Sequence, residues 1–529
     1  MSSRLGVRRD MFNTKSAVKT VSFMMIATLT AKMLGMLRDM LLAVNYGTGW
    51  EAEAFLTAIR IPIMFFDIGL GAAISSTFIP VFNTYLQNED KEKAIRFSNN
   101  FVNIVLLITA LITFLGILFA RQLADFIAPG LDEQTILLTI RLMHILFPMI
   151  VFTGLAYSYV GILQSLNEFN IPAAISLVSN AIVIIYFIFF NRSLGIFGLA
   201  VAMLVGWAAQ VIVQIPSLKK KGYAYRPVLD FKSEGIRKVA LLTLPILIST
   251  WVQPINGMVN LRLATNIQGG IAALEYAYRL FINIGGIFTY ALTNLIFPSL
   301  SRMSAGENRE QFAKLMTTAL RTVIYFIIPL MVGFITLRVP LVRLIYERGA
   351  FDAASTKMTA VALLFYAMGM LGFAVQETMS KGFYALHEAS TPMKVAVGGI
   401  TLNIILSFVF FRYLELGVGG LALAASVAST VIAVTLVVVM HKKIQGIFNM
   451  QVLVHFLKVV FAVMVMGIVV MGIGQILDIR LGSTLTDRVL RLGIPVIAGV
   501  LTYGIVTFML GVKEAKVGWH MIKDQWKRV

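Results

Sequence analysis

Fourteen mainly apolar stretches follow one another along this chain, each of about 20 residues or more, the length that a helix needs to cross about 30 Å of hydrocarbon. The sequence therefore predicts an all-α polytopic membrane protein with 14 transmembrane helices. Its 58% hydrophobic and 13% charged residues exclude a soluble enzyme. The predicted spans are residues 18–44, 54–86, 98–120, 135–164, 171–190, 196–218, 239–263, 272–300, 315–337, 356–386, 391–411, 418–440, 453–477 and 489–511.

Basic residues concentrate in alternate connections between these spans. The connections on the side of the two termini hold 25 Lys and Arg, against 8 on the opposite side. Because cytoplasmic loops of membrane proteins are enriched in Lys and Arg, we predict a multi-pass membrane protein with both termini in the cytoplasm. The net charge of +19 is then chiefly a signal of orientation, and no nucleic-acid partner is predicted.

Residue types that commonly hold metals or carry covalent catalysis are scarce. The chain has no cysteine, and its five histidines are scattered without metal-binding spacing. We therefore predict neither a metal site nor a bound cofactor.

An internal repeat organises the spans. Short motifs recur at nearly constant offsets: residues 77–80 and 295–298 (offset 218), 165–168 and 385–388 (offset 220), and 195–200 and 417–422 (offset 222). We therefore predict two copies of a six-span unit in the same orientation, with the substrate between them. The predicted division is an N-lobe at 1–218, a basic cytoplasmic linker at 219–238, a C-lobe at 239–443, an extra pair of spans at 444–511 and an amphipathic cytoplasmic tail at 512–529.

Charged residues inside the spans are costly in lipid, so we expect them to face a cavity or a partner. Four basic residues are predicted to bind an anionic substrate such as a phosphate or pyrophosphate: Lys32, Arg38, Arg60 and Arg279. Arg60 and Arg279 occupy nearly equivalent places in the repeat, at an offset of 219, and are expected to approach each other.

Structural explanations compete with this binding role. Arg38 could pair with Asp39 or Glu53, Arg279 with Glu275, and Arg60 could extend toward the membrane surface, while Lys32 is evenly open between the two. Five acidic residues are candidates for lining or gating the cavity: Asp39, Glu53, Asp67, Glu275 and Glu377. Glu377 and Lys381, four residues apart, are interpreted as a structural ion pair. Arg321, near a span end, is interpreted as extending to the interface.

The chain resembles the MurJ/MviN lipid II flippases of the multidrug/oligosaccharidyl-lipid/polysaccharide exporter superfamily, through motifs that occur in order along nearly the whole sequence. These motifs are residues 31–39, 53–55, 75–80, 128–130, 161–163 with Phe169 and Pro172, 276–280, 297–301, 347–351, and 383–385 with Thr391 and Pro392.

The resemblance implies translocation of the undecaprenyl-pyrophosphate-linked peptidoglycan precursor, lipid II, from the cytoplasmic to the outer leaflet by alternating access, in the bacterial cytoplasmic (inner) membrane. Coupling of this transport to the membrane potential, to sodium or to protons stays open. It places head-group cations at Lys32, Arg38 and Arg279, and acidic positions at Asp39 and Glu53. It implies that the extra spans at 444–511 form a groove for the lipid tail. The sequence departs from the family at 65–71, where a basic residue is missing, so that either Arg60 replaces it or the substrate differs.

Other functions remain in competition with this hypothesis. A flippase for another polyprenyl-linked oligosaccharide, such as an O-unit or capsule precursor, would share the same superfamily. A cation-coupled drug exporter would have twelve spans and an acidic cavity, and a glycosyltransferase would need larger loops with acidic catalytic residues. We therefore predict a transporter that works with membrane lipids around it, as a monomer, and not an enzyme.

Overall fold

The computed structural model describes residues 14–65, 74–87, 91–250, 252–305, 309–482 and 484–516. Throughout these ranges the chain forms helices and connecting turns, without a strand. Asp67 and the part of the predicted tail beyond residue 516 lie outside them. An all-helical polypeptide is the expected outcome for so apolar a chain, because a helix satisfies every backbone hydrogen bond within its own segment.

The chain divides into two compact units, which we call unit 1 and unit 2. Unit 1 comprises Met1–Leu41, Ala54–Phe126 and Asp132–Pro254, and unit 2 comprises Leu42–Glu53, Ile127–Leu131 and Ile255–Val529. The boundary cuts through four helices: α1 (Thr14–Tyr46), α2 (Trp50–Phe65), α6 (Ala120–Ile127) and α12 (Val252–Ala264). The turn that joins α1 and α2 belongs to unit 2.

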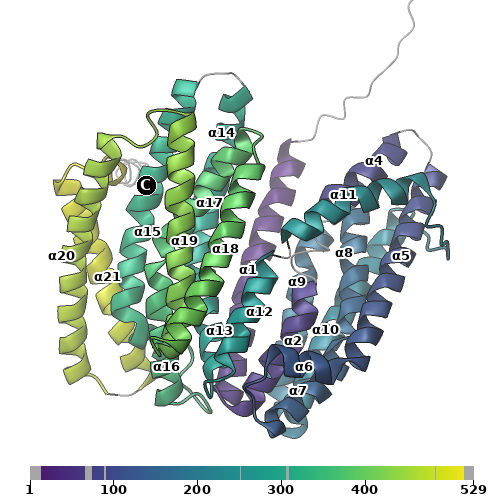
Figure 1. Cartoon of the computed structure of the whole chain (residues 1–529), viewed down its shortest axis with the longest axis horizontal. Coiled ribbons are helices and arrows are strands. Elements are labelled where there is room, and N and C mark those ends of the chain that lie inside the picture. Colours follow the sequence, from purple (N-terminus) through teal and green to yellow (C-terminus); the bar gives the residue numbers. More distant parts are fainter. Residues whose placement is uncertain are drawn as a thin grey trace, which may run out of the picture. The chain divides into compact units, whose positions relative to one another are not determined.

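Unit 1 contains most of the helices up to residue 254 (Figure 1). These are the main part of α1 and of α2, the π-helix η2 (Ile74–Phe78), α4 (Ile79–Gln87), α5 (Lys91–Leu118), α6 (Ala120–Ile127), α7 (Glu133–Leu146), α8 (Met149–Ser165), α9 (Asn170–Phe189), α10 (Asn191–Lys220) and α11 (Glu234–Thr250). Stacked aromatic rings hold part of its core together, with the Phe78 and Phe101 centroids 4.4 Å apart and those of Phe78 and Phe82 5.3 Å apart.

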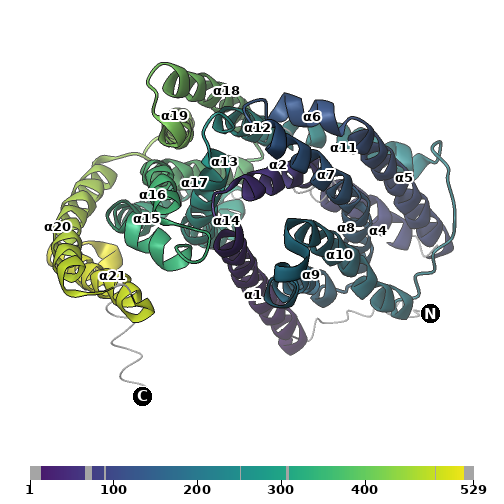
Figure 2. The same cartoon turned by 90° about the horizontal axis from the view of Figure 1, so that it is seen from below.

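Unit 2 contains the later helices. These are α12 (Val252–Ala264), α13 (Gly270–Leu280), the π-helix η3 (Phe281–Gly286), α14 (Ile287–Ala305), α15 (Arg309–Ile345), α16 (Ala353–Met368), α17 (Met370–Ala385), α18 (Ser390–Arg412), α19 (Gly417–Lys443), α20 (Met450–Arg480) and α21 (Leu485–Met509). The two views show α20 and α21 side by side, packed on α15 at the periphery of this unit (Figure 2).

Among the described residues, eleven helices are long and apolar enough to span a membrane, and the pair of α16 and α17, which are bent by 43° relative to each other, makes a twelfth. Each of these twelve coincides with a predicted span. The two other predicted spans, 54–86 and 239–263, are divided among shorter helices, α2, η2 and α4 in the first and α11 and α12 in the second. The multi-pass helical fold is therefore confirmed, and fourteen spans are compatible with it.

The repeat is visible in the backbone. Asn167 and His387, 220 residues apart, both have φ 58°, a left-handed conformation in which asparagine and histidine are enriched among residues other than glycine. Each follows a helix and closes it in the same way, since Glu168 N donates to Leu163 O and Glu388 N donates to Phe383 O, at 2.8 and 2.9 Å. Corresponding helices of the two copies thus end in the same turn.

The predicted linker at 219–238 contains an ordered segment, residues 221–233, which we call the strap. Three asparagines of α5 bind its backbone: Asn99 donates to Ala224 O (2.9 Å), Asn100 to Asp230 O (2.7 Å) and Asn103 to Val228 O (2.8 Å). The hydroxyl of Tyr223 donates to Asn99 Oδ1 at 2.6 Å, and burial raises the pKa of this phenol, which keeps it a neutral donor. The boundaries of the predicted lobes and linker stay predictions.

Candidate functional site

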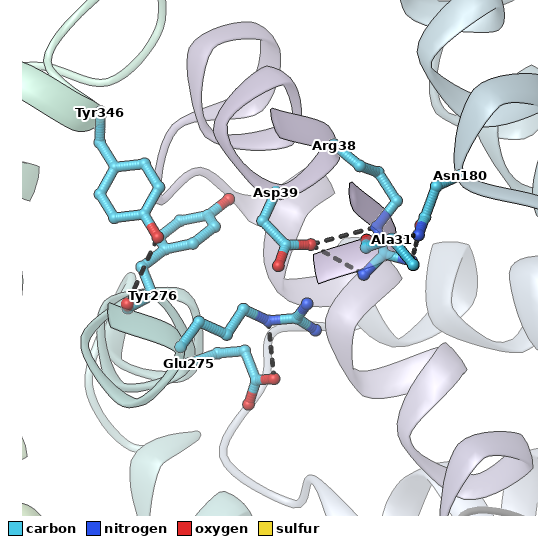
Figure 3. A network of polar contacts seen from close by, with 8 residues as sticks. Ala31, Arg38, Asp39, Asn180, Glu275, Tyr276 and Tyr346 are labelled. Carbon is cyan, nitrogen blue, oxygen red and sulfur yellow. Dashed lines mark hydrogen bonds and ion pairs between the residues drawn. The ribbon is translucent and has the colours of Figure 1, made fainter. Parts of the chain in front are cut away.

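In unit 1, Arg38 is held by two side chains (Figure 3). Its Nε and one terminal nitrogen donate to Asp39 Oδ1 at 3.2 and 3.0 Å, and the other terminal nitrogen donates to Asn180 Oδ1 on α9 at 3.2 Å. Asn180 in turn donates to Ala31 O at 3.2 Å, which fixes the orientation of its amide. Asp39 is buried while Arg38 is half-buried, so the guanidinium is the accessible member of this ion pair.

The other predicted cations of unit 1 are Lys32 and Arg60. Lys32 lies two helical turns before Asp39 on α1 and is exposed, and Arg60 is half-buried on α2. Asp67 lies outside the described residues. The expected approach of Arg60 to Arg279 stays a prediction.

In unit 2, Arg279 and Glu275 form an ion pair one turn apart on α13. Arg279 Nε donates to Glu275 Oε1 at 3.0 Å, and each side chain keeps about a fifth of its surface exposed. The pairing considered as a structural explanation is therefore present, as it is for Arg38 and Asp39. A paired guanidinium is still able to bind phosphate, because its remaining N–H groups are donors and phosphate oxygens compete with the carboxylate.

Glu377 and Lys381 of α17 interact through their charges but make no close ion-pair contact in the described part of the chain. Both side chains are half-buried, and Lys381 Nζ lies 5.2 Å from the centre of the Phe297 ring on α14. The aromatic face is thus a second partner of the ammonium group.

The interpretation of Arg321 as extending to the membrane interface is wrong. Arg321 does not extend freely to the interface but pairs at 3.0 Å with Glu514, just after α21, and both side chains are nearly buried. His455 of α20 contacts the same carboxylate at 3.5 Å.

The described ranges hold no cluster of three or more His, Asp or Glu side chains that could hold a metal ion. The arrangement that remains consists of guanidinium groups inside an apolar helical fold, each beside a carboxylate. Such groups suit an anion that enters the membrane region.

The family model described as "Lipid II flippase MurJ" matches residues 42–513 of this chain. The chain belongs to the lipid II flippase MurJ family.

Curated relatives and solved structures agree with the MurJ assignment. The probable lipid II flippase MurJ of Rhizobium tropici is 27% identical, with 92% of each chain covered, and the lipid II flippase MurJ of Burkholderia cenocepacia is 26% identical over 80% of this chain and 83% of its own. A solved structure of lipid II flippase MurJ in an inward closed conformation has a TM-score of 0.78 at 26% identity and covers 92% of this chain and 98% of that chain. An inward-facing multidrug resistance MATE transporter of the MOP superfamily, at 14% identity and a TM-score of 0.66, shares the fold.

Several motifs by which the sequence resembles the MurJ family meet at one corner of unit 2. Glu53 is buried and accepts a hydrogen bond from Ile271 N at 3.3 Å, at the first turn of α13. The hydroxyl of Tyr276 donates to Gly47 O at 3.1 Å, and that of Tyr346 lies 3.5 Å from Tyr276 O (Figure 3). Glu53 thus stabilises the amino-terminal end of the helix that carries Arg279.

Glycines allow this corner to close. Gly349 and Gly47 both have φ 57°, and a Cβ atom on Gly349 would lie 2.4 Å from Val44 O. Ala350 N donates to that same oxygen at 2.8 Å. The Glu-Arg-Gly-Ala-Phe motif at 347–351 therefore needs glycine for direct backbone packing against the end of α1.

Asn180, which orients Arg38, is not among the residues predicted from the sequence. The available signal was an asparagine inside an otherwise apolar span, where an unpaired amide is costly and implies a partner.

Proposed function

We propose that this chain is a flippase that moves lipid II, the undecaprenyl-pyrophosphate-linked peptidoglycan precursor, from the cytoplasmic to the outer leaflet for cell-wall synthesis. The observation that carries the proposal is the match to the MurJ family over residues 42–513, nearly the whole chain. The chemistry of the spans supports it, since Arg38 and Arg279 offer guanidinium groups to an anionic head group in an apolar surrounding.

The proposed mechanism is alternating access by the two repeats. Lys32, Arg38, Arg60 and Arg279 hold the pyrophosphate and release it when the binding region opens outward. Asp39 and Glu275 are the carboxylates that the phosphate oxygens displace from the guanidinium groups, and that take them back once the cargo leaves. Each guanidinium is then never left without a counter-charge in the membrane, which would be costly.

We place the lipid tail along α20 and α21, in the extra spans at 444–511. This pair packs on α15 through Val459, Val463 and Tyr503 and presents many apolar side chains on its exposed faces. An inside-negative membrane potential would favour outward movement of the anionic head group by about 2.3 kcal/mol per charge per 100 mV. The potential is therefore our proposed driving force, in a monomer of the cytoplasmic membrane with both termini inside.

Complementation tests this function. We expect the chain to restore growth to cells depleted of their own lipid II flippase, and Arg38→Ala or Arg279→Ala to lower plating by about 100-fold or more, as for loss of a charged contact to phosphate worth about 3 kcal/mol. Arg121→Ala is the matched control, because Arg121 is largely exposed on α6. Membrane levels of each variant are measured by immunoblot. Full growth with Arg279→Ala at normal levels would contradict its role.

A flippase for another polyprenyl-linked oligosaccharide is the second candidate, favoured by the departure at 65–71. Failure of the wild-type chain to restore lipid II exposure on the outer leaflet, despite normal expression, would favour that candidate.

A further inference from the structure

Three polar side chains lie on one stripe of α17. Glu377, Lys381 and Tyr384 follow one another at intervals of four and three residues, which places them on the same helix face. Tyr290 of α14 lies close enough to Glu377 for an electrostatic interaction, as does Tyr384. We call these four residues the tyrosine wall; all belong to unit 2.

The polar groups of the tyrosine wall make no hydrogen bond in the described part of the chain. Glu377 and Lys381 interact through their charges, and Lys381 Nζ also lies over the ring of Phe297. Tyr290 and Tyr384 are 38% and 44% exposed. Four polar groups with unused hydrogen-bonding capacity thus lie together on helices whose other residues are mainly apolar.

A second stripe of unit 2 shows what a lipid-facing surface of this protein contains. The exposed residues Leu457, Phe461, Met464 and Ile468 follow α20 at helical spacing and are all apolar. Lipid does not compensate a carboxylate and an ammonium group in mid-span, so the tyrosine wall faces a polar ligand or water.

We propose that the tyrosine wall binds the sugar and peptide part of the lipid-linked head group. It would then recognise this part of the cargo, while the arginines hold the pyrophosphate. This inference rests on the proposed function. The rings of Tyr290 and Tyr384 offer apolar faces to sugar rings, and their hydroxyls offer hydrogen bonds to sugar hydroxyls and amides.

The charges of the wall suit this part of the cargo better than they suit pyrophosphate. Glu377 and Lys381 sum to zero, whereas a pyrophosphate needs an excess of cations, as at Arg38 and Arg279. A peptide that carries carboxylates and an amine offers one partner to Lys381 and one to Glu377.

Two ligands separate the parts of the head group. The purified full-length chain in lipid nanodiscs is titrated with lipid II and with undecaprenyl pyrophosphate, which has the same tail and anion but no sugar. We expect Tyr290→Leu, Tyr384→Leu and the double variant Glu377→Gln/Lys381→Gln to weaken lipid II binding about 3-fold to 10-fold each, the range of one aromatic or polar contact. Their affinity for undecaprenyl pyrophosphate should stay within about 2-fold of the wild type, a difference of about 0.4 kcal/mol.

Tyr413→Leu is the matched control, because Tyr413 is an exposed tyrosine in the turn after α18 and should change neither affinity. Arg279→Ala should weaken both ligands together. Because each variant is compared on two ligands, general misfolding lowers both affinities and is distinguished from loss of head-group contacts.

Equal losses for the two ligands, or no loss for either, would overturn the tyrosine wall as a head-group site while leaving the flippase proposal intact. A wild-type chain that binds neither ligand would instead overturn the proposed function and this inference with it.

Discussion

Polar contacts between segments within unit 1 differ in kind from those within unit 2. In unit 1, neutral amides make many of the polar contacts between segments: Asn99, Asn100 and Asn103 bind the strap, and the buried Gln214 on α10 donates to Ala156 O on α8 at 3.1 Å. In unit 2, ion pairs make several of these contacts: Arg321 with Glu514, Arg488 with Glu347, Lys443 with Glu388 and Arg491 with Asp478.

The difference between amide contacts and ion pairs indicates how each unit uses charge inside the membrane. An amide contact needs no counter-ion and responds weakly to salt and pH, whereas removal of one partner of a buried ion pair leaves an uncompensated charge. In unit 1 the half-buried pair of Arg38 and Asp39 lies at the candidate site. We infer that charge in this unit serves mainly binding, while unit 2 uses charge both for binding and for structure.

Loss of the carboxylate of Glu514 should have the largest structural effect. Glu514→Gln leaves Arg321 nearly buried without its counter-charge, and Arg321 Nε already has no hydrogen-bond partner. We expect a loss of about 3–5 kcal/mol in the free energy of unfolding. The thermal midpoint of the purified protein, measured in detergent, should fall clearly.

Glu310→Gln is the matched control for this prediction. It breaks the pair of Glu310 and Lys314 on the same helix, α15, where both side chains are about three-quarters exposed, and should change the midpoint little. Equal thermal midpoints for the Glu514 and Glu310 variants would show that burial of the Arg321–Glu514 pair does not matter to stability. The contrast between amide contacts in unit 1 and structural ion pairs in unit 2 would then not hold.

Most of the fold could be predicted from the sequence because apolar length and charge asymmetry report directly on membrane spans. Twelve predicted spans coincide with single or bent helices. The helix bounds within 54–86 and 239–263 could not be predicted, because a π-helix such as η2 depends on packing against neighbouring helices rather than on local apolar content.

The candidate site could be predicted only in part. Arg38 and Arg279 stood out because charge is rare in apolar spans, and their carboxylate neighbours are close in sequence. Asn180, 142 residues from Arg38, and Glu514, 193 residues from Arg321, required the tertiary structure. Lys381 shows the limit of spacing arguments, since the four-residue interval predicted its interaction with Glu377 but not its contact with the ring of Phe297.

The strap tests the amide chemistry of unit 1 with a smaller effect. Asn100 is buried, donates to Asp230 O and Ser233 Oγ and accepts from Asp230 N, at 2.7–3.1 Å. Asn100→Ala leaves these groups without partners and should cost about 1–3 kcal/mol locally. We expect faster trypsin cleavage after Arg226 and Lys232, with the rest of the protein unchanged, and no dependence of this effect on salt. Cleavage at the wild-type rate would show that Asn100 does not hold the strap.

The smallest effect should come from a pair of repeat-related glutamates that the two units use differently. Glu388 accepts hydrogen bonds from Lys443 and Thr391, whereas Glu168, 220 residues earlier, accepts one from Asn170 N at 3.1 Å. The Lys443 ammonium, followed by the Thr391 hydroxyl, holds the pKa of Glu388 below its usual value. A lowered folded-state pKa stabilises the protein above the unfolded pKa of about 4.3, and this stabilisation is lost as the pH falls through the folded-state value.

Glu388→Gln should therefore lower the thermal midpoint slightly at pH 7, by an amount that corresponds to less than about 1 kcal/mol for so exposed a pair. The difference from the wild type should shrink as the pH falls from about 5 to below 4, because protonation of Glu388 removes the same charge that the substitution removes. The pH series is measured for both proteins in the same detergent. Glu168→Gln should show a smaller difference at pH 7. If the difference in thermal midpoint between wild type and Glu388→Gln stays constant down to pH 3, the charge of Glu388 contributes nothing to stability. Ion pairs would then stabilise unit 2 only outside this turn.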